Sequence, residues 1–272
     1  MSKKESKKNK KQEITELQQT RPTLKGVYVA VLNQGWIRPE LVKILLELSR
    51  QGGYRLAVTF PADKPISNSR NKIVRNFLST DFDYLMMIDG DNIPPSNILA
   101  LADFEKDIIG GLCFAQRYDN KRPVYIPLIL NRTKDEKTLE KYSESQRKYR
   151  YTPVELNGTE GLLEVDAIGT GCIIMSRKVL EEPTMEYPFK NLYDENGEKL
   201  IGLDLYFCRR AKELGYKVYC HTDYPIGHWS DQNLKMVYGS LRALIDENKH
   251  LQKQIQSSES NNNINKNEDN GK

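Results

Sequence analysis

The stretch YLMMIDGD (Tyr84–Asp91) decides the fold of this chain. Its first five residues are all apolar, whereas a strand with one solvent-exposed face alternates apolar and polar residues. Such a strand is covered on both faces, as strands in the middle of a parallel sheet are. The strand ends at Asp89, and ligands of open α/β sheets bind outside the carboxyl ends of the strands. The sequence therefore predicts a ligand site at Asp89-Gly90-Asp91.

The segments around this stretch alternate between strand and helix. Apolar runs at 27–32 and 54–60 predict strands, and amphipathic stretches at 39–50 and 69–78 predict helices. This order is typical of an α/β fold, a mixed and mostly parallel sheet flanked by helices. Asn92-Ile93-Pro94-Pro95 should break the central strand and start a helix. Further elements are expected as strands at 108–114, 124–130, 162–175 (interrupted at 169–171) and 217–220, and as a helix at 203–214.

Composition predicts one globular domain with polar ends. The chain has 272 residues, of which 38% are apolar and 29% charged, and we assign residues 22–232 to the domain. Residues 1–21 and 257–272 are too polar to bury a core, so we expect disordered tails. The polar insertion 131–160 could serve as a lid or as an acceptor loop.

Charge and hydropathy restrict the partners and the compartment. The net charge is only +4, with the densest basic run inside the first twelve residues, so nothing demands nucleic acid as a partner. No secretory signal and no run of about 18 apolar residues occurs, which predicts a soluble, cytoplasmic protein without a transmembrane segment. The widely spaced cysteines lack zinc-site spacing and are expected to be buried reduced thiols: Cys113, Cys172, Cys208 and Cys220.

Residues 233–256 predict a long C-terminal helix with a heptad pattern. Apolar residues recur in steps of three and four over about three heptads, at Leu234, Val237, Leu241, Leu244, Leu251 and Ile255. Asn248 occupies an a-like position, which favours a defined register and a low-order homo-oligomer. The alternative is a helix that packs back on its own domain.

The motif Asp89-Gly90-Asp91 carries oxygen ligands suited to a hard cation. Residues two apart in an extended segment point to the same side, so both carboxylates could face one Mg²⁺ or Mn²⁺ ion. An isolated D-x-D also occurs in solvated turns, but its position after a buried strand favours a site. His228 follows Gly227 late in the chain and is a candidate third metal ligand.

A cation is expected at the start of the second helix. Ser67 or Ser69 could cap that helix, and Arg70 shares a face with its apolar residues. A guanidinium on the inward side of a helix N-terminus favours phosphate. The alternative is a surface arginine paired with Asp63 or Asp81.

Asp204 begins the predicted helix at 203–214. It falls in line with the apolar stripe formed by Phe207, Cys208 and Ala211. A carboxylate on the buried face suggests a general base that deprotonates an acceptor hydroxyl. The alternative is that Asp204 only caps the helix or complements its dipole.

Four motifs in order resemble a known family: YLMMIDGDNIPP (84–95), VDAIGTGCIIMSRKVL (165–180), GLDLYFCRRAKELGYKVY (202–219) and IGHW (226–229). Together they are similar to family-2-like GT-A glycosyltransferases, of the nucleotide-diphospho-sugar transferase superfamily, over residues 27–229. The resemblance implies a Rossmann-like GT-A fold and a metal-dependent transfer of sugar from a nucleotide-sugar donor to an acceptor hydroxyl.

The resemblance also assigns roles to residues. Asp89 and Asp91 would bind the donor's ribose and the metal that bridges its diphosphate, and His228 would complete the metal site. The family's Glu-Asp pair at the acceptor helix is here Leu203-Asp204. The aspartate is retained as the base of an inverting transfer, while the missing glutamate puts that mechanism in doubt.

Weaker assignments follow from the same resemblance. Arg70 and Asn71 would contact the donor, Asn33 would hold the nucleotide, and Gly169-Thr170-Gly171 would line the sugar pocket. Arg117 is similarly placed near the donor, with a solvated loop arginine beside Asp119 as the alternative.

Two other functions fit part of this pattern. A nucleotidyltransferase also needs paired aspartates, a metal and a basic residue, but would carry a Gly-rich loop after the first strand, which Asn33-Gln34-Gly35-Trp36 is not. A non-catalytic sugar-binding protein of the same fold would explain the missing glutamate before Asp204. The sequence does not fix the donor base, the sugar, the acceptor or the stereochemical outcome.

Overall fold

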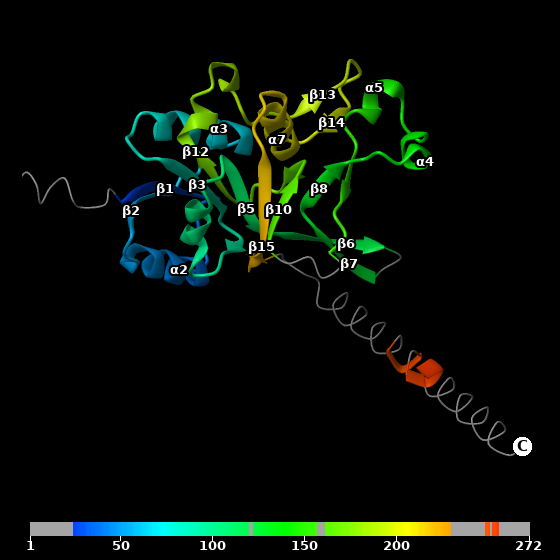
Figure 1. Cartoon of the computed structure of the whole chain (residues 1–272), viewed down its shortest axis with the longest axis horizontal. Helices are drawn as coiled ribbons and strands as arrows, with labels where there is room; N and C mark the ends of the chain where they lie inside the picture. Colours follow the sequence, from blue (N-terminus) through cyan, green and yellow to red (C-terminus); the bar gives the residue numbers. More distant parts are fainter. Residues whose placement is uncertain (1–23, 120–121, 157–160, 230–247, 251, 256–272) are drawn as a thin grey trace, which may run out of the picture.

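The chain is described by a computed structural model that covers residues 24–119, 122–156, 161–229, 248–250 and 252–255. A seven-stranded sheet runs through its centre (Figure 1). In spatial order its strands are β10 (Leu162–Val165), β15 (Val218–Pro225), β5 (Ile108–Leu112), β12 (Cys172–Ser176), β3 (Tyr84–Asp89), β1 (Lys25–Leu32) and β2 (Tyr54–Thr59).

Most strands of this sheet run in one direction. β1 is parallel to both β2 and β3, and β15 is parallel to β5. β12 lies antiparallel between β3 and β5, and β10 is antiparallel to β15. Five of the seven strands are therefore parallel to one another and two are reversed. The predicted fold class, an α/β fold with a mixed and mostly parallel sheet, is confirmed.

Helices cover both faces of the sheet. On one face lie α2 (Pro39–Arg50) and η1 (Ile98–Phe104), and on the other lie α3 (Ile66–Leu78), α6 (Arg177–Leu180) and α7 (Leu203–Glu213) (Figure 1).

Side chains of β3 alternate between the two cores. Met86 and Ile88 pack into the core under α2, whereas Leu85 and Met87 pack into the core under α3 and α7. All four side chains are fully buried, which explains why this strand has no polar alternation.

The first helices test the predicted boundaries. α2 matches the prediction, and α3 begins at Ile66, directly after Pro65. Ser67 and Ser69 therefore lie inside α3, and the prediction that one of them caps it is wrong. Pro65 occupies the N-cap position and supplies no side-chain hydrogen bond. Proline favours a helix start because its fixed φ suits the turn and it has no N–H to satisfy.

The segment after Asp91 does not start a helix at Pro94-Pro95. Asn92–Ile93 forms the short strand β4, which pairs with β16 (Gly227–His228), and the next helix, η1, is a 3₁₀-helix that begins at Ile98. Pairing with a distant strand overrides the local helix signal here, which is why the sequence pattern alone misplaced this element.

Two predicted strands are each split in the structure. Beyond β5 the chain enters β6 (Phe114–Asp119), which forms a hairpin with β7 (Arg122–Pro127) outside the main sheet. After Pro127 the chain passes into β8 (Ile129–Arg132), in a different sheet. A continuous apolar run does not reveal where a chain leaves one sheet for another.

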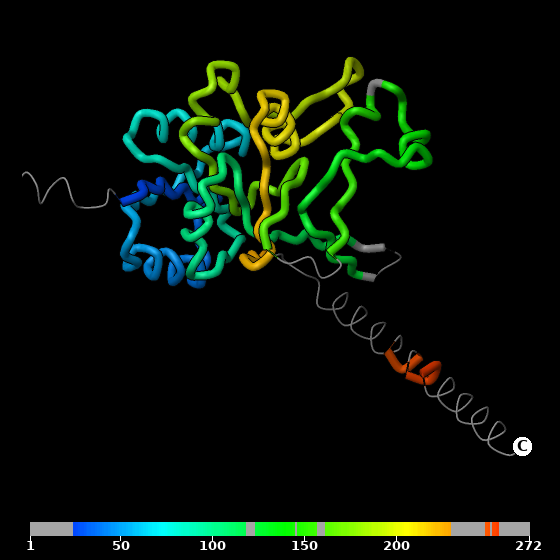
Figure 2. Tube along the Cα trace, viewed as in Figure 1, coloured from blue at the N-terminus to red at the C-terminus, as the bar shows by residue number. Residues whose placement is uncertain are grey.

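The insertion at 131–160 contains regular structure. It holds α4 (Glu136–Leu139), α5 (Glu144–Arg147) and β9 (Tyr151–Pro153). β8 lies between β9 and β11 (Ala167–Ile168) in a three-stranded sheet. Figure 2 shows this green part of the chain on the side of the molecule remote from β2. The remaining short elements are η2 (Pro183–Met185), β13 (Leu192–Tyr193) and β14 (Lys199–Ile201).

The other sequence predictions meet the structure in part. All four cysteines are free and buried, as predicted. Among the described residues, no helix has the length and apolar character needed to cross a membrane. Residues 248–250 and 252–255 are helical, but most of the predicted C-terminal helix lies outside the described residues. The coiled coil and the homo-oligomer remain predictions.

Candidate functional site

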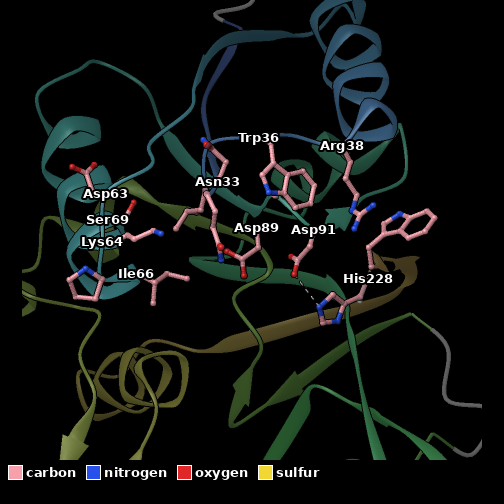
Figure 3. A pocket seen from close by; sticks show the side chains of 15 residues that line it. Asn33, Trp36, Arg38, Asp63, Lys64, Ile66, Ser69, Asp89, Asp91 and His228 are labelled. Atoms are coloured by element: carbon pink, nitrogen blue, oxygen red, sulfur yellow. Dashed lines mark ion pairs between the residues drawn. The ribbon is translucent and has the colours of Figure 1, made fainter. Parts of the chain in front are cut away.

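A cavity of 810 Å³ opens at the carboxyl ends of β1 and β3. This volume lies in the range of small-molecule sites, about 300–1,000 Å³. Four segments form its walls: the loop after β1, the loop between β2 and α3, the turn that holds Asp89 and Asp91, and the segment 228–229. The lining residues are Leu32, Asn33, Gln34, Trp36, Arg38, Asp63, Lys64, Pro65, Ile66, Ser69, Asp89, Gly90, Asp91, His228 and Trp229 (Figure 3). The sequence predicted a site at this end of β3.

The Asp89-Gly90-Asp91 segment is a turn, not an extended strand. β3 ends at Asp89, and Gly90 and Asp91 adopt turn conformation before β4. A Cβ on Gly90 would lie 2.8 Å from the carbonyl oxygen of Leu32, so only glycine fits this close approach to β1. The extended backbone that the sequence analysis assumed here is wrong, although both aspartates line the cavity.

Asp91 is brought to His228 by pairing between distant segments. β4 pairs with β16, and the Trp229 N–H donates to the Asp91 carbonyl oxygen at 2.9 Å. The His228 Nε2 atom lies 3.5 Å from Asp91 Oδ2, and the two side chains are 37% and 48% exposed. Figure 3 shows both at the same side of the cavity.

The other ring nitrogen of His228 fixes the tautomer. His228 Nδ1 lies 2.9 Å from the carbonyl oxygen of Phe114. A carbonyl oxygen can only accept, so Nδ1 carries the proton in this bond. In the neutral ring, Nε2 then presents a lone pair toward the Asp91 carboxylate. Two electron-rich atoms that face each other in this way favour a cation between them.

Asp89 also lines the cavity, but its carboxylate pairs with Arg70. Arg70 Nη2 lies 2.9 Å and 3.0 Å from the two oxygens of Asp89, and the Arg70 side chain is 2% exposed. Burial raises the pKa of Asp89 to about 6, and the nearby Asp204 and Asp91 carboxylates add to this effect while Arg70 opposes it.

Both sequence interpretations of Arg70 need correction. It is not a surface arginine, because Asp63 pairs with Lys72 and Asp81 pairs with Arg55. It also does not line the cavity, because its guanidinium is buried between Asp89 and Asp204. Contact between Arg70 and a ligand phosphate would require this pairing to break.

Asp204 lies on the far side of Arg70. Its Oδ1 atom accepts a short hydrogen bond from Thr170 Oγ1 and lies 3.5 Å from Arg70 Nη1. Its Oδ2 atom has a 3.5 Å contact with the Thr170 N–H. Asp204 is in the first turn of α7, but it accepts from Thr170 and Arg70, and α7 has no side-chain cap. A helix cap is therefore excluded as the role of Asp204, whereas its place in the first turn still allows it to complement the helix dipole.

Two of the three predicted metal ligands, Asp91 and His228, lie close together, and metal binding itself stays a prediction. Among the described residues, no group of three or more His, Cys, Asp or Glu side chains is close enough to hold a metal ion. Asp91 and His228 face each other, but Asp89 is committed to Arg70. The residues present fit a cation held by Asp91 and His228, with its other coordination positions left for ligand oxygens.

Of the two asparagines predicted to contact the donor, one lines the cavity and the other is buried away from it. Asn33 lines the cavity, and its side chain joins the loops after β1 and β2 by accepting from the Gly35 N–H and donating to the Pro61 carbonyl. Asn71 is buried, and both of its polar atoms bond to the backbone of Phe189. It therefore ties α3 to residue 189 and does not reach the cavity.

The Gly169-Thr170-Gly171 segment also stands behind the cavity wall. Thr170 is fully buried. A Cβ on Gly171 would lie 2.0 Å from Asn92 Nδ2, so this glycine allows β12 to approach β4. The segment supports Asp89 and Asp204 and is not part of the cavity lining. Arg117, on β6, is exposed and does not line the cavity either.

Sequence reasoning missed four cavity residues that contribute cations and aromatic rings. The Arg38 guanidinium lies 5.1 Å from the ring centre of Trp36 and 4.7 Å from that of Trp229. Lys64 adds a second cation. Trp36 lies four residues after the end of β1, and a tryptophan in the loop at the carboxyl end of a strand is a signal that the sequence offered.

Comparison with known proteins gives structural likeness only. No protein-family model matches the chain, and no curated protein matches it. A197 from STIV has a TM-score of 0.46 at 17% identity, over 76% of this chain and 87% of that one. The inositol-1-phosphate CTP transferase from T. maritima has a TM-score of 0.38 at 13% identity, over 82% and 96%. The nucleoside-diphosphate-sugar pyrophosphorylase from Vibrio cholerae RC9 has a TM-score of 0.32 at 9% identity, over 73% and 72%. At these scores the likeness assigns no activity to this chain.

Proposed function

We propose that this chain is a metal-dependent glycosyltransferase that binds a nucleotide-sugar in the cavity beside Asp91. The observation that carries the proposal is the arrangement of His228, whose Nδ1 atom is held by the Phe114 carbonyl while Nε2 faces the Asp91 carboxylate at 3.5 Å. Histidine and carboxylate ligands with open coordination positions suit Mn²⁺ or Mg²⁺ bound together with a diphosphate.

The chain's own residues supply the rest of the binding site. A bound divalent ion would neutralise charge that develops on a leaving diphosphate. Arg38 lines the same cavity, between two indole rings, and can offset further negative charge. Trp36 is 58% exposed, and its face offers a stacking surface for a nucleobase. Asn33 braces the loop that carries this ring.

Asp204 is proposed as the general base. Asp204 does not line the cavity. Its side chain is 38% exposed, so an acceptor hydroxyl could approach it from outside the cavity lining. Thr170 and Arg70 occupy mainly its Oδ1 atom, which leaves Oδ2 to take the proton.

A nucleotidyltransferase is the second candidate, and the cations of the cavity favour it. Lys64 and Arg38 line the cavity, and among the described residues neither forms a recorded ion pair. Two cations and a metal would suit a triphosphate. Against it, the loop after β1 is not rich in glycine, since Gly35 is its single glycine.

A donor panel separates the two reactions. The purified protein is incubated with Mn²⁺ and individual nucleotide-sugars, and release of nucleoside diphosphate is measured. Parallel samples receive a nucleoside triphosphate with a sugar 1-phosphate, and pyrophosphate is measured. Release of nucleoside diphosphate supports glycosyl transfer, whereas pyrophosphate formation supports the second candidate. Neither product with any substrate would contradict both.

Asp204→Asn tests the proposed base. A positioned general base contributes about 10²-fold or more to the rate, so the variant should lose at least that factor while it still binds nucleoside diphosphate. Asp223→Asn is the matched control, because Asp223 is exposed and does not line the cavity. Normal turnover by Asp204→Asn, or a product that keeps the donor's anomeric configuration, would exclude this role.

A further inference from the structure

The start of α3 forms a second polar region of the cavity. Lys64, Ile66 and Ser69 line the cavity there. Figure 3 shows Lys64 and Ser69 at the α3 side and His228 at the opposite side. The Asp91–His228 pair can therefore bind one group while the α3 side contacts another.

Helix α3 has a positive end that the protein does not neutralise locally. Its N-cap residue is Pro65, no side chain caps it, and its first turn contains no acidic residue. In contrast, α2 carries Glu40 and α7 carries Asp204 in the first turn. The first N–H groups of an α-helix have no carbonyl partner within the helix, and together with the helix dipole they attract anions.

Ser69 provides an independent indication of a ligand. Its side chain is 2% exposed, and its Oγ atom has no hydrogen-bond partner among the described residues. Buried polar atoms without a partner are uncommon in folded proteins. Because Ser69 also lines the cavity, an oxygen atom of a bound ligand would give this hydroxyl the partner it lacks.

The charges near this end favour an anion. Lys64 is exposed, lines the cavity and forms no ion pair with another described residue. The adjacent Asp63 carboxylate lies 2.9 Å from Lys72 Nζ and is thereby neutralised. Asp89, the other acidic group nearby in the cavity, is paired with Arg70. An oxyanion at the start of α3 would therefore lie near the Lys64 ammonium group. The two nearby carboxylates, Asp63 and Asp89, are already paired with cations and would repel it less.

We propose that Lys64, Ser69 and the first turn of α3 form an oxyanion subsite that binds a phosphate or carboxylate group of the substrate without a metal ion. The proposal deepens the proposed function, since it adds an acidic group to the substrate class of the same cavity. Binding at this subsite does not need the Asp91–His228 metal, so the two proposals can fail separately.

Inorganic phosphate in the presence of EDTA is the direct probe. Binding to the full chain is followed by ³¹P NMR line broadening, which detects weak binding. Lys64→Gln should weaken phosphate binding about tenfold and Ser69→Ala about threefold, because charge-assisted hydrogen bonds are the stronger kind. Asp91→Asn should leave it unchanged. Lys43→Gln is the matched control, because Lys43 is an exposed lysine on α2 and does not line the cavity.

The source of the acidic group is tested with two larger probes. Glucose 1-phosphate in EDTA represents a phosphorylated second substrate, and UDP-glucuronic acid compared with UDP-glucose in Mn²⁺ represents an acidic donor sugar. The probe whose affinity falls in Lys64→Gln identifies the source.

Phosphate binding that is absent, that requires Mn²⁺, or that is equal in the parent protein, Lys64→Gln and Ser69→Ala would overturn the subsite. UDP affinity that is equal with and without Mn²⁺ would instead contradict the proposed function and leave the phosphate result unaffected.

Discussion

Asp89 and Asp91 are two residues apart, and the protein uses their carboxylates differently. Asp89 is 26% exposed and has both oxygens within 3.0 Å of Arg70. Asp91 is 48% exposed and faces His228 across 3.5 Å in the cavity. The turn at Gly90 separates them. The comparison shows that one motif can hold both a carboxylate paired with a buried arginine and a carboxylate exposed in a cavity, and that the environment distinguishes the two.

The buried side of this comparison is a connected network. Arg70 pairs with Asp89 and Asp204, donates to the Thr170 carbonyl, and Thr170 in turn bonds to Asp204. On the exposed side, the side chains make the Asp91–His228 contact and the bond from His228 to Phe114, and the Trp229 N–H donates to the Asp91 backbone. Substitutions in the network should therefore affect stability, and substitutions on the exposed side should affect ligand binding.

The largest stability effect is expected for Arg70→Ala. It removes a buried guanidinium and leaves Asp89 and Asp204, which are 26% and 38% exposed, without their cation. Removal of one partner of a fully buried ion pair costs about 3–5 kcal/mol, so the loss here should fall toward the lower end of that range. Urea denaturation measures the free energy of unfolding. Arg75→Ala, an exposed arginine on the same helix, should change it by less than about 0.5 kcal/mol. A loss below about 1 kcal/mol for Arg70→Ala would show that the network is not structural.

A smaller effect is expected for Gly171→Ala. The new Cβ would lie 2.0 Å from the buried Asn92 side chain, and overpacking a filled site costs about 1–3 kcal/mol. The same denaturation experiment measures this loss. Gly52→Ala is the control, because nothing lies within 4 Å of a Cβ at that position. Equal stability of the two variants would contradict the close approach of β12 to β4.

The smallest measurable effect is expected for Thr170→Val. The substitution removes the hydroxyl that donates to Asp204 and keeps the side-chain shape, so it should cost about 1 kcal/mol. Thr184→Val, at an exposed threonine, should have almost no effect. If both variants unfolded at the same urea concentration as the parent protein, Asp204 would not depend on Thr170 for its position.

The strands and helices that hold the cavity could be predicted from sequence where local and long-range preferences agree. The fully apolar run of β3 and the amphipathic pattern of α2 lead to the observed elements. Prediction failed where pairing with a segment distant in the sequence determines the secondary structure. β4 is a strand because β16 pairs with it, and no pattern within 92–95 contains that information.

The candidate site was predicted in position but not in detail. Asp91 and His228 meet as expected. The role of Arg70 was missed, because its burial between Asp89 and Asp204 depends on how α3, β3 and α7 pack together. Trp36, Arg38 and Lys64 were missed because loop residues carry no periodicity that reveals which way they face.

Calorimetry of UDP with and without Mn²⁺ tests the central claim, that Asp91 and His228 hold a metal for a diphosphate. Mn²⁺ should strengthen UDP binding to the parent protein about tenfold or more, in line with the 10- to 100-fold effects of metal-site substitutions. Asp91→Asn and His228→Ala should abolish this dependence and change the free energy of unfolding by less than about 0.5 kcal/mol, while Asp223→Asn keeps the dependence. Equal UDP affinity with and without Mn²⁺ in the parent protein would contradict the account.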